Sequence, residues 1–218
     1  MLDEAQQQYN IEEKGVQVYV AEFDDGVEVS EVNPPMRNAA IEECTDPLLK
    51  RQRYCVWRLL DYALQHSIGK GIDELNFTRD DNGKWSCDGG VYFSLSHSRQ
   101  AVAVAVCKTE PVGVDIEYLA LGRFNDRLAE RVLTDREKHM RAMYAPKFQM
   151  YYFASCWTKK EAIFKRDGGA NFIPGQIETS EFKDCTGRVT MDYGVYILSA
   201  VSTSNLPMQL NKIKVKEW

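Results

Sequence analysis

Apolar and polar positions along the chain follow two patterns, one with a period of two residues and one with helical spacing. Alternation and short apolar runs predict strands, because successive side chains of a strand point to opposite faces. The predicted strands are residues 16–23, 91–96, 101–107, 112–118, 189–202 and 209–216. Apolar residues at helical spacing predict helices over 47–66, 124–143 and 146–166.

The order of these elements predicts an α+β fold made of two similar halves, residues 1–110 and 111–218. Each half is expected to run from a strand through helix to further strands. Residues 72–90 carry two turn signals, Asp81-Asn82-Gly83 and Asp88-Gly89-Gly90, and are predicted to be rich in loops. The boundary between the halves rests on element order, since no linker marks it.

Composition and charge narrow the classes of function. With 218 residues, of which 44% are hydrophobic and 27% charged, the chain is expected to fold around a sizeable core. Its longest uncharged apolar run, residues 101–107, is too short to span a bilayer, so no membrane partner is expected. A net charge of −5 argues against broad nucleic-acid binding, which needs a basic face.

Cysteine usage and the first residues indicate a cytoplasmic location. The cysteines show neither a CxxC pair nor metal-ligand spacing, and they are Cys44, Cys55, Cys87, Cys107, Cys156 and Cys185. Met1–Glu4 contains neither the basic nor the apolar region of a secretion signal. Scattered cysteines in apolar stretches are typical of proteins in a reducing compartment.

Two carboxylates in the predicted strand 112–118 indicate a metal site. Asp115 and Glu117 alternate with apolar residues and therefore share one strand face, together with Gly113. Mg²⁺ in proteins prefers one or two carboxylates completed by waters and phosphates. Half-exposed strands also carry alternating charges, so this segment alone leaves an ordinary strand as the alternative.

The predicted helix 146–166 carries a second group of charged residues. Lys160 falls within its apolar stripe, and a lysine there must either reach solvent or meet an anion. Glu161 and Lys165 lie on the edge of the stripe, at the i, i+4 spacing of a helical salt bridge. That salt bridge is the simpler explanation of the pair.

Two further segments have features that suit an anionic ligand. Residues 94–98 (SLSHS) combine hydroxyls with an imidazole, which can bind a phosphate or cap a turn. Serine-hydrolase chemistry is not expected, because a nucleophilic serine needs a base that the fold brings to it. Arg53 lies in the apolar face of helix 47–66, where it either meets a partly buried anion or packs its stem and reaches water.

Taken together, these segments resemble the signature of 4′-phosphopantetheinyl transferases. The matching residues are 113–117 (GVDIE), 157–165 (WTKKEAIFK) and 93–98 (FSLSHS). Gly83-Lys84 resembles a Gly-Lys pair of the family, although Trp85 stands where the family usually has proline. The resemblance covers residues 83–165, and the chain length is similar to that of Sfp-type members, which are monomers of two similar α+β halves.

The resemblance implies a reaction and its catalytic residues. The family transfers the 4′-phosphopantetheine arm of coenzyme A to a serine of an apo acyl or peptidyl carrier protein and releases adenosine 3′,5′-bisphosphate. By resemblance, Asp115, Glu117 and Glu161 hold Mg²⁺, with Mn²⁺ as a substitute. Glu161 is the implied base, and Lys165 and Asp115 complete the implied catalytic set.

The resemblance also implies residues that bind coenzyme A. Lys160 and Lys165 are implied to lie by the pyrophosphate. The residues implied to bind the 3′-phosphate end are Ser96, His97, Lys84, Arg53 and, more weakly, Arg37.

Two other functions stay open at this level. The carboxylates alone also suit another Mg²⁺-dependent enzyme that cleaves a phosphoanhydride, and coenzyme A binding alone suits a module without catalysis. For carrier docking, we predict an exposed basic and hydrophobic patch within residues 121–148. Its candidates are Arg123, Phe124, Arg127, Arg131, Met140, Met143 and Phe148. The alternative places Met140, Met143 and Phe148 in the core.

Overall fold

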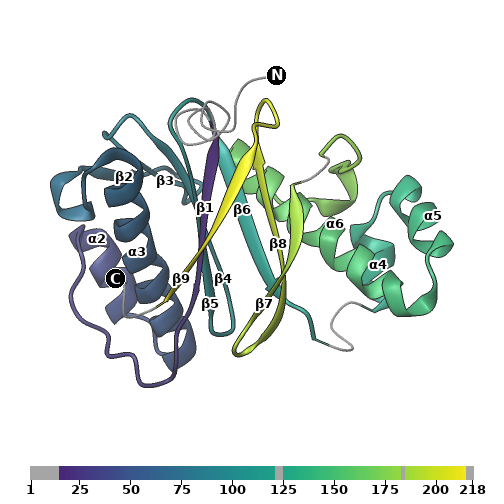
Figure 1. The fold of residues 1–218 in the computed structure, drawn as a ribbon, viewed down its shortest axis with the longest axis horizontal. Coiled ribbons are helices and arrows are strands. Elements are labelled where there is room, and N and C mark those ends of the chain that lie inside the picture. Colours follow the sequence, from purple (N-terminus) through teal and green to yellow (C-terminus); the bar gives the residue numbers. More distant parts are fainter. Residues whose placement is uncertain (1–14, 121–124, 183–184, 215–218) are drawn as a thin grey trace, which may run out of the picture.

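A computed structural model describes residues 15–120, 125–182 and 185–214 of the chain (Figure 1). Its first half contains β1 (Val16–Glu22), α2 (Pro35–Glu42), α3 (Pro47–Ile68), the 3₁₀ helix η1 (Ile72–Glu74), β2 (Phe77–Arg79), β3 (Trp85–Cys87), β4 (Tyr92–Ser98) and β5 (Ala101–Cys107). The second half contains β6 (Val112–Tyr118), α4 (Asp126–Val132), α5 (Asp135–Met143), α6 (Pro146–Asp167), the 3₁₀ helix η2 (Pro174–Gln176), β7 (Thr186–Met191), β8 (Gly194–Ser202) and β9 (Met208–Lys214). The predicted α+β class is confirmed.

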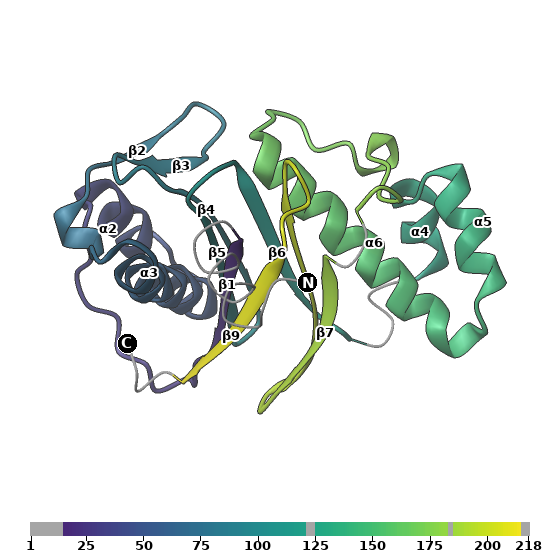
Figure 2. The same ribbon diagram turned by 45° about the horizontal axis from the view of Figure 1, so that its top comes forward.

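The elements form four layers, with two sheets in the middle and helices on the outside (Figures 1 and 2). One sheet has the strand order β4-β5-β1-β9, the other has the order β6-β8-β7, and β2 and β3 form a separate hairpin. The helix α3 covers the first sheet and α6 covers the second. Between the sheets lies a core of small and β-branched side chains.

The alternation within β5 explains why it is buried on both faces. Its alternate valines pack against α3, and its alternate alanines and Cys107 pack between the two sheets. Small side chains on the inner face let the sheets approach closely, because little volume has to be accommodated there. The uncharged run 101–107 is therefore a central strand of the core.

The helix α3 begins and ends as its sequence predicts. The Asp46 side chain accepts a hydrogen bond from the Leu49 amide at 2.9 Å, and Pro47 occupies the first turn. Gly69 ends the helix in the left-handed conformation, with φ of 70°, where a glycine has no steric penalty.

The two halves share one order and one pairing of strands. In the first half β1 pairs with β5 and β5 with β4, and in the second β6 pairs with β8 and β8 with β7, all antiparallel. The strand β9 departs from this plan, because it returns to the first sheet and runs parallel to β1, with Met208 opposite Val16. The sequence boundary near residue 110 therefore falls between β5 and β6, but it does not divide the sheets.

One predicted helix and one predicted strand are each divided into two in the structure. The single helix expected over 124–143 is wrong, because Thr134 interrupts it and caps α5 by accepting from the Glu137 amide at 3.3 Å. The single strand expected over 189–202 is also wrong, because the turn at Asp192-Tyr193 separates β7 from β8.

The predicted loop over 72–90 is also more ordered than expected. It contains η1 and the short hairpin of β2 and β3, whose turn is the predicted Asp81-Asn82-Gly83 signal. Strands of three residues are too short to show alternation in a sequence. Within the described ranges, no helix is both long and apolar enough to cross a membrane.

Candidate active site

The two sheets meet along a seam between the edge strands β4 and β6, and serine side chains join them there. Backbone amides of β6 donate to serine hydroxyls of β4 in the pairs Val114–Ser94 (3.0 Å), Ile116–Ser96 (3.2 Å) and Tyr118–Ser98 (3.0 Å). Edge amides that are buried need such acceptors. The SLSHS segment therefore uses its serines to close the edge of the second sheet.

The strand β6 presents its carboxylates toward α6. Its apolar residues pack into the core between the sheets, which leaves Gly113, Asp115 and Glu117 on the other face, as predicted from alternation. Gly113 is required there, because a Cβ atom would lie 1.8 Å from the carbonyl oxygen of Ala162 in α6. This close approach of helix and strand brings Lys165 to the carboxylates of β6.

The central contact of the site is the ion pair of Lys165 and Asp115. The Lys165 Nζ lies 2.7 Å from Asp115 Oδ1, so the ion pair of Lys165 is with the strand and not with Glu161. Ser96 joins the pair, since its Oγ donates to Asp115 Oδ1 at 2.8 Å and accepts from Lys165 Nζ at 3.1 Å. The other oxygen of Asp115, Oδ2, is buried without a hydrogen-bond partner.

Glu161 adds negative charge to the same place. Burial raises the pKa of its carboxyl to about 7, with Asp115 and Glu117 adding to the rise and Lys165 opposing it. A carboxyl whose ionisation is opposed by two neighbouring carboxylates is a group that a cation would stabilise.

The donor set fits a divalent cation. The unpartnered Oδ2 of Asp115 and the raised pKa of Glu161 both show negative charge that the protein does not fully compensate. Carboxylate oxygens are the ligands that Mg²⁺ prefers. Among the described residues, no three His, Cys, Asp or Glu side chains already converge as a metal site, so the carboxylates have to move together around the ion.

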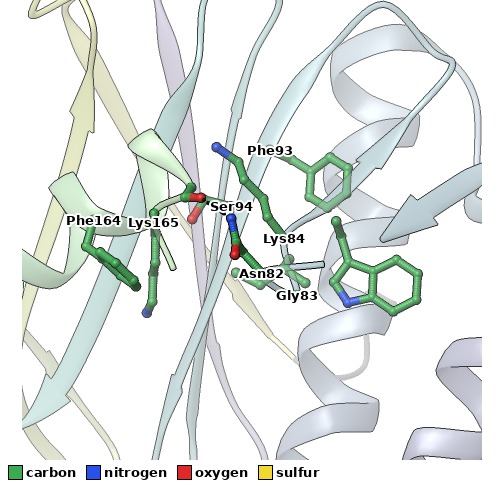
Figure 3. A pocket seen from close by; sticks show the side chains of 11 residues that line it. Asn82, Gly83, Lys84, Phe93, Ser94, Phe164 and Lys165 are labelled. Carbon is green, nitrogen blue, oxygen red and sulfur yellow. Dashed lines mark hydrogen bonds between the residues drawn. The ribbon is translucent and has the colours of Figure 1, made fainter. Parts of the chain in front are cut away.

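A pocket of about 230 Å³ opens beside this ion pair, and both halves line it (Figure 3). Lys84 and Phe93 come from the first half, while Phe164 and Lys165 come from α6 and lie on the other side of the pocket. Two lysines together with the aromatic rings of Trp85, Phe93 and Phe164 suit a ligand with both an anionic group and a ring.

The tip of the β2–β3 hairpin reaches the C-terminal end of α6 across this pocket. Lys84 Nζ donates to the carbonyl oxygen of Arg166 at 2.5 Å, and Asn82 Nδ2 donates to that of Gly168 at 3.0 Å. Burial lowers the pKa of Lys84, which shows that its ammonium has lost part of its hydration. An anion in the pocket would restore that stabilisation.

A second group of cations lies around His97. Burial lowers the pKa of His97 to about 4, and the neighbouring charges of Lys165, Arg37 and Arg53 lower it further. Burial also lowers the pKa of Arg37 to about 10, with Arg53 and Arg79 as further causes. Neither Arg37 nor Arg53 forms an ion pair with a carboxylate in the described part of the chain, and such a cluster of like charges suits an anionic ligand.

Lys160 lies apart from this site, on another face of α6. Its side chain is 0% exposed, and its Nζ forms an ion pair with Glu137 Oε2 at 2.7 Å. It also donates to the carbonyl oxygens of Pro174 at 3.0 Å and of Ile177. Of the two predicted outcomes, Lys160 thus meets an anion, Glu137, and does not reach solvent. The structure does not bring Lys160 to the pocket, where the resemblance implied a contact with the pyrophosphate.

Comparison with known proteins shows that one segment of the chain matches a protein family. Residues 111–203 match the family described as the 4′-phosphopantetheinyl transferase superfamily. Over these residues the chain is similar to that superfamily. The matched segment includes β6 with Asp115 and Glu117, and α6 with Glu161 and Lys165.

Several relatives are named 4′-phosphopantetheinyl transferases. The chain is 29% identical to 4′-phosphopantetheinyl transferase HetI of Nostoc sp., over 54% of this chain and 52% of the relative. It is 29% identical to 4′-phosphopantetheinyl transferase gsp of Aneurinibacillus migulanus, over 47% of this chain and 42% of the relative. It is 30% identical to 4′-phosphopantetheinyl transferase AcpT of Escherichia coli (strain K12), over 56% of this chain and 60% of the relative. The chain thus spans about half the length of the curated relatives it matches.

The structure gives Ser96 a role beside the carboxylates. The hydroxyl has one hydrogen, which it donates to Asp115, and it accepts from both Lys165 and the Ile116 amide. Its hydrogen-bonding capacity is therefore used. A contact from Ser96 to a 3′-phosphate, as the resemblance implied, would require the bond to Asp115 to break.

Two contacts of the described residues were missed by reasoning from the sequence. Ser98 Oγ donates to Glu117 Oε2 at 2.8 Å, and no local pattern indicates a contact between residues 19 positions apart. Glu137 was missed as the partner of Lys160, although the spacing of Thr134 and Glu137 is that of a capping box.

The predicted docking patch is exposed where the structure describes it. Met143 is 70% exposed, and Met140 and Phe148 are also exposed, so the alternative that placed them in the core is wrong. Arg127 and Arg131 are exposed on α4. Two candidates, Arg123 and Phe124, lie outside the described residues.

Proposed function

We propose that this protein transfers the 4′-phosphopantetheine arm of coenzyme A to a serine of an apo acyl or peptidyl carrier protein and releases adenosine 3′,5′-bisphosphate. The observation that carries the proposal is the Lys165–Asp115 pair, which lies beside a cationic pocket between the two halves. We also propose that the protein is of the Sfp type, with two halves related by a pseudo-two-fold axis, and that it acts as a monomer.

Coenzyme A suits the arrangement of cations along the seam. Its pyrophosphate would lie between Lys84 and Lys165, and the aromatic wall of the pocket would contact its adenine ring. Its 3′-phosphate would be bound by the cations around His97, which are Arg37 and Arg53.

Asp115, Glu117 and Glu161 would hold Mg²⁺ or Mn²⁺. The bound ion supplies charge neutralisation on the pyrophosphate oxygens. A bound ion would give the unpartnered oxygen of Asp115 a partner and would oppose the rise in the pKa of Glu161 that burial causes.

The side chains of the seam then supply the remaining parts of a phosphoryl-type transfer. The carrier serine oxygen forms a bond to the phosphorus that bears the pantetheine arm, and the anhydride bond from that phosphorus to the bisphosphate breaks. Glu161, in its ionised form, accepts the serine proton. Lys165 lies where it stabilises the charge that develops on the leaving bisphosphate.

The carrier protein is proposed to dock on α4, α5 and the start of α6. Carrier proteins of this superfamily tend to be acidic, which suits the exposed arginines Arg127 and Arg131 beside the exposed Met140, Met143 and Phe148. A cytoplasmic location is proposed because all six cysteines are free.

The test is to mix the protein with coenzyme A, Mg²⁺ and a panel of apo carrier proteins and to record intact carrier masses. We expect one phosphopantetheine to be added to at least one carrier, and EDTA to abolish the addition. Failure of coenzyme A to bind would overturn the proposal. Release of bisphosphate without any carrier would favour a phosphoanhydride hydrolase, and tight binding without transfer to any carrier would favour a module without catalysis.

A further inference from the structure

The serines of β4 do more than accept amides, because two of them also hold carboxylates. Ser96 donates to Asp115 Oδ1 at 2.8 Å, and Ser98 donates to Glu117 Oε2 at 2.8 Å. Each serine thus contacts two successive residues of β6, a carboxylate and the amide that follows it. The same offset occurs twice, two residues apart, as expected for two strands whose facing side chains repeat with a period of two.

Ser94 provides an internal comparison for this arrangement. It accepts from the Val114 amide at 3.0 Å, as the other two serines accept from their amides. At the position where the others meet a carboxylate, β6 has Gly113, which has no side chain. Ser94 and Ser98 are buried to a similar degree, with 7% and 6% exposed. The two serines therefore differ in the carboxylate contact and in the pocket, which Ser94 lines and Ser98 does not. Coenzyme A is kept saturating for every variant below, so that a change in its affinity does not enter the comparison.

We propose that Ser98 is a positioning residue for Glu117, so that a strand of the first half orients both carboxylates that β6 offers to the divalent cation. This inference rests on the proposed function, in which those carboxylates hold the ion. A glutamate side chain has several rotatable bonds, and a hydrogen bond to one carboxylate oxygen limits its orientations. Groups that orient metal ligands in this way typically change metal affinity or activity by about 10-fold to 100-fold when they are removed.

The seam between β4 and β6 thus brings side chains of both halves to the proposed metal site. The first half contributes the hydroxyls and the second half contributes the carboxylates. The hydroxyls can therefore hold the carboxylates in place only when β4 and β6 lie in this register. A shift of β4 by one residue would turn its serines to the other face and remove both contacts.

The test is Mn²⁺ binding, measured from the electron paramagnetic resonance signal of free Mn²⁺, with saturating coenzyme A and without carrier protein. Ser98→Ala is expected to weaken Mn²⁺ binding by about 10-fold to 100-fold. Ser94→Ala, which loses the same kind of amide contact, is expected to bind Mn²⁺ within about threefold of the unaltered protein. Ser98→Thr keeps the hydroxyl and is expected to restore most of the affinity. Melting temperatures separate this effect from folding, since both alanine variants lose one amide acceptor.

A double-mutant cycle tests whether Ser98 acts through Glu117. In a Glu117→Ala background, Ser98→Ala is expected to cause little further loss of Mn²⁺ affinity. Unaltered protein that binds Mn²⁺ and modifies a carrier, together with a Ser98→Ala variant that binds Mn²⁺ as well as Ser94→Ala does, would overturn this inference alone. Unaltered protein that binds no Mn²⁺ would overturn both this inference and the proposed metal dependence.

Discussion

Lys160 and Lys165 lie on the same helix and form ion pairs of the same length, yet their surroundings differ. Lys160 pairs with Glu137 at 2.7 Å and is fully buried, whereas Lys165 pairs with Asp115 at 2.7 Å and its side chain is 29% exposed. Glu137 also accepts hydrogen bonds from the Thr179 hydroxyl and the Thr134 amide, at 2.6 and 2.9 Å.

This difference distinguishes a structural pair from a pair that can act on a ligand. Both oxygens of Glu137 have donors, so the pair can take no further partner. Asp115 keeps one buried oxygen without a partner, and Lys165 faces a pocket. A close ion pair alone is therefore a poor sign of function, and the unsatisfied capacity around it is a better one.

The largest expected effect on stability comes from breaking the buried pair. Lys160→Met leaves Glu137 buried without its counter-ion, so we expect the free energy of unfolding to fall by about 3–5 kcal/mol. Transfer activity per folded molecule is expected to change little, because Lys160 does not reach the pocket. Urea denaturation and carrier-mass assays measure the two quantities.

Replacing both partners is the control for that variant. Adding Glu137→Leu to Lys160→Met removes the uncompensated charge, and we expect most of the lost stability to return. Equal stability of the single variant and the unaltered protein would contradict the structural role of this pair.

Breaking the Lys165–Asp115 pair beside the pocket is expected to affect activity instead. Asp115→Asn keeps the size of the side chain but removes its charge, and we expect transfer to slow by about 100-fold to 1,000-fold. The rate of phosphopantetheine addition to a carrier measures this. Asp25→Asn makes the same substitution in a surface pair, that of Asp25 with Arg51, and is expected to retain full activity.

A smaller effect concerns His97 and pH. Its folded pKa of about 4 is below the value of about 6.5 expected in the unfolded chain, so between these values the unfolded chain binds more protons. This contribution to stability is complete above about pH 6.5 and is lost as the pH falls toward 4. Urea denaturation across this range should show a shallower pH dependence in His97→Gln. If the free energy of unfolding depends on pH equally in His97→Gln and in the unaltered protein, the pKa of His97 is not lowered by burial as described.

The smallest expected effect comes from the surface beside the structural pair. Met143 lies on α5, as Glu137 does, but it is exposed. Met143→Ser is expected to change the free energy of unfolding by less than about 0.5 kcal/mol. The KM for the carrier is expected to rise a few fold with kcat retained, as measured by steady-state kinetics with varied carrier. A raised KM for coenzyme A instead would contradict the proposed docking patch.

Short-range sequence patterns predict which face of a strand or helix a side chain occupies. Alternation in 112–118 correctly places Asp115 and Glu117 on one face. The apolar stripe of α6 left two outcomes for Lys160, solvent or an anion, and the structure shows the anion. The division of the helix at Thr134 could also have been read from its capping box.

The contacts across the seam could not be predicted in the same way. The serines of β4 meet residues 19 and 20 positions away, and only the packing of two sheets sets that register. The partner of Lys160 comes from a separate helix, and the spacing within α6 carries no information about it. Long-range contacts of this kind depend on the whole fold, not on a short window of sequence.

The return of β9 to β1 has a consequence for the order in which the protein is made. The ribosome releases β1 early and β9 after nearly all the other elements, so one edge of the first sheet stays open while the rest of the chain emerges. An open edge is a template for pairing with another chain. Nascent copies on neighbouring ribosomes are therefore exposed to mispairing at β1 until β9, the last of the described strands, closes this edge.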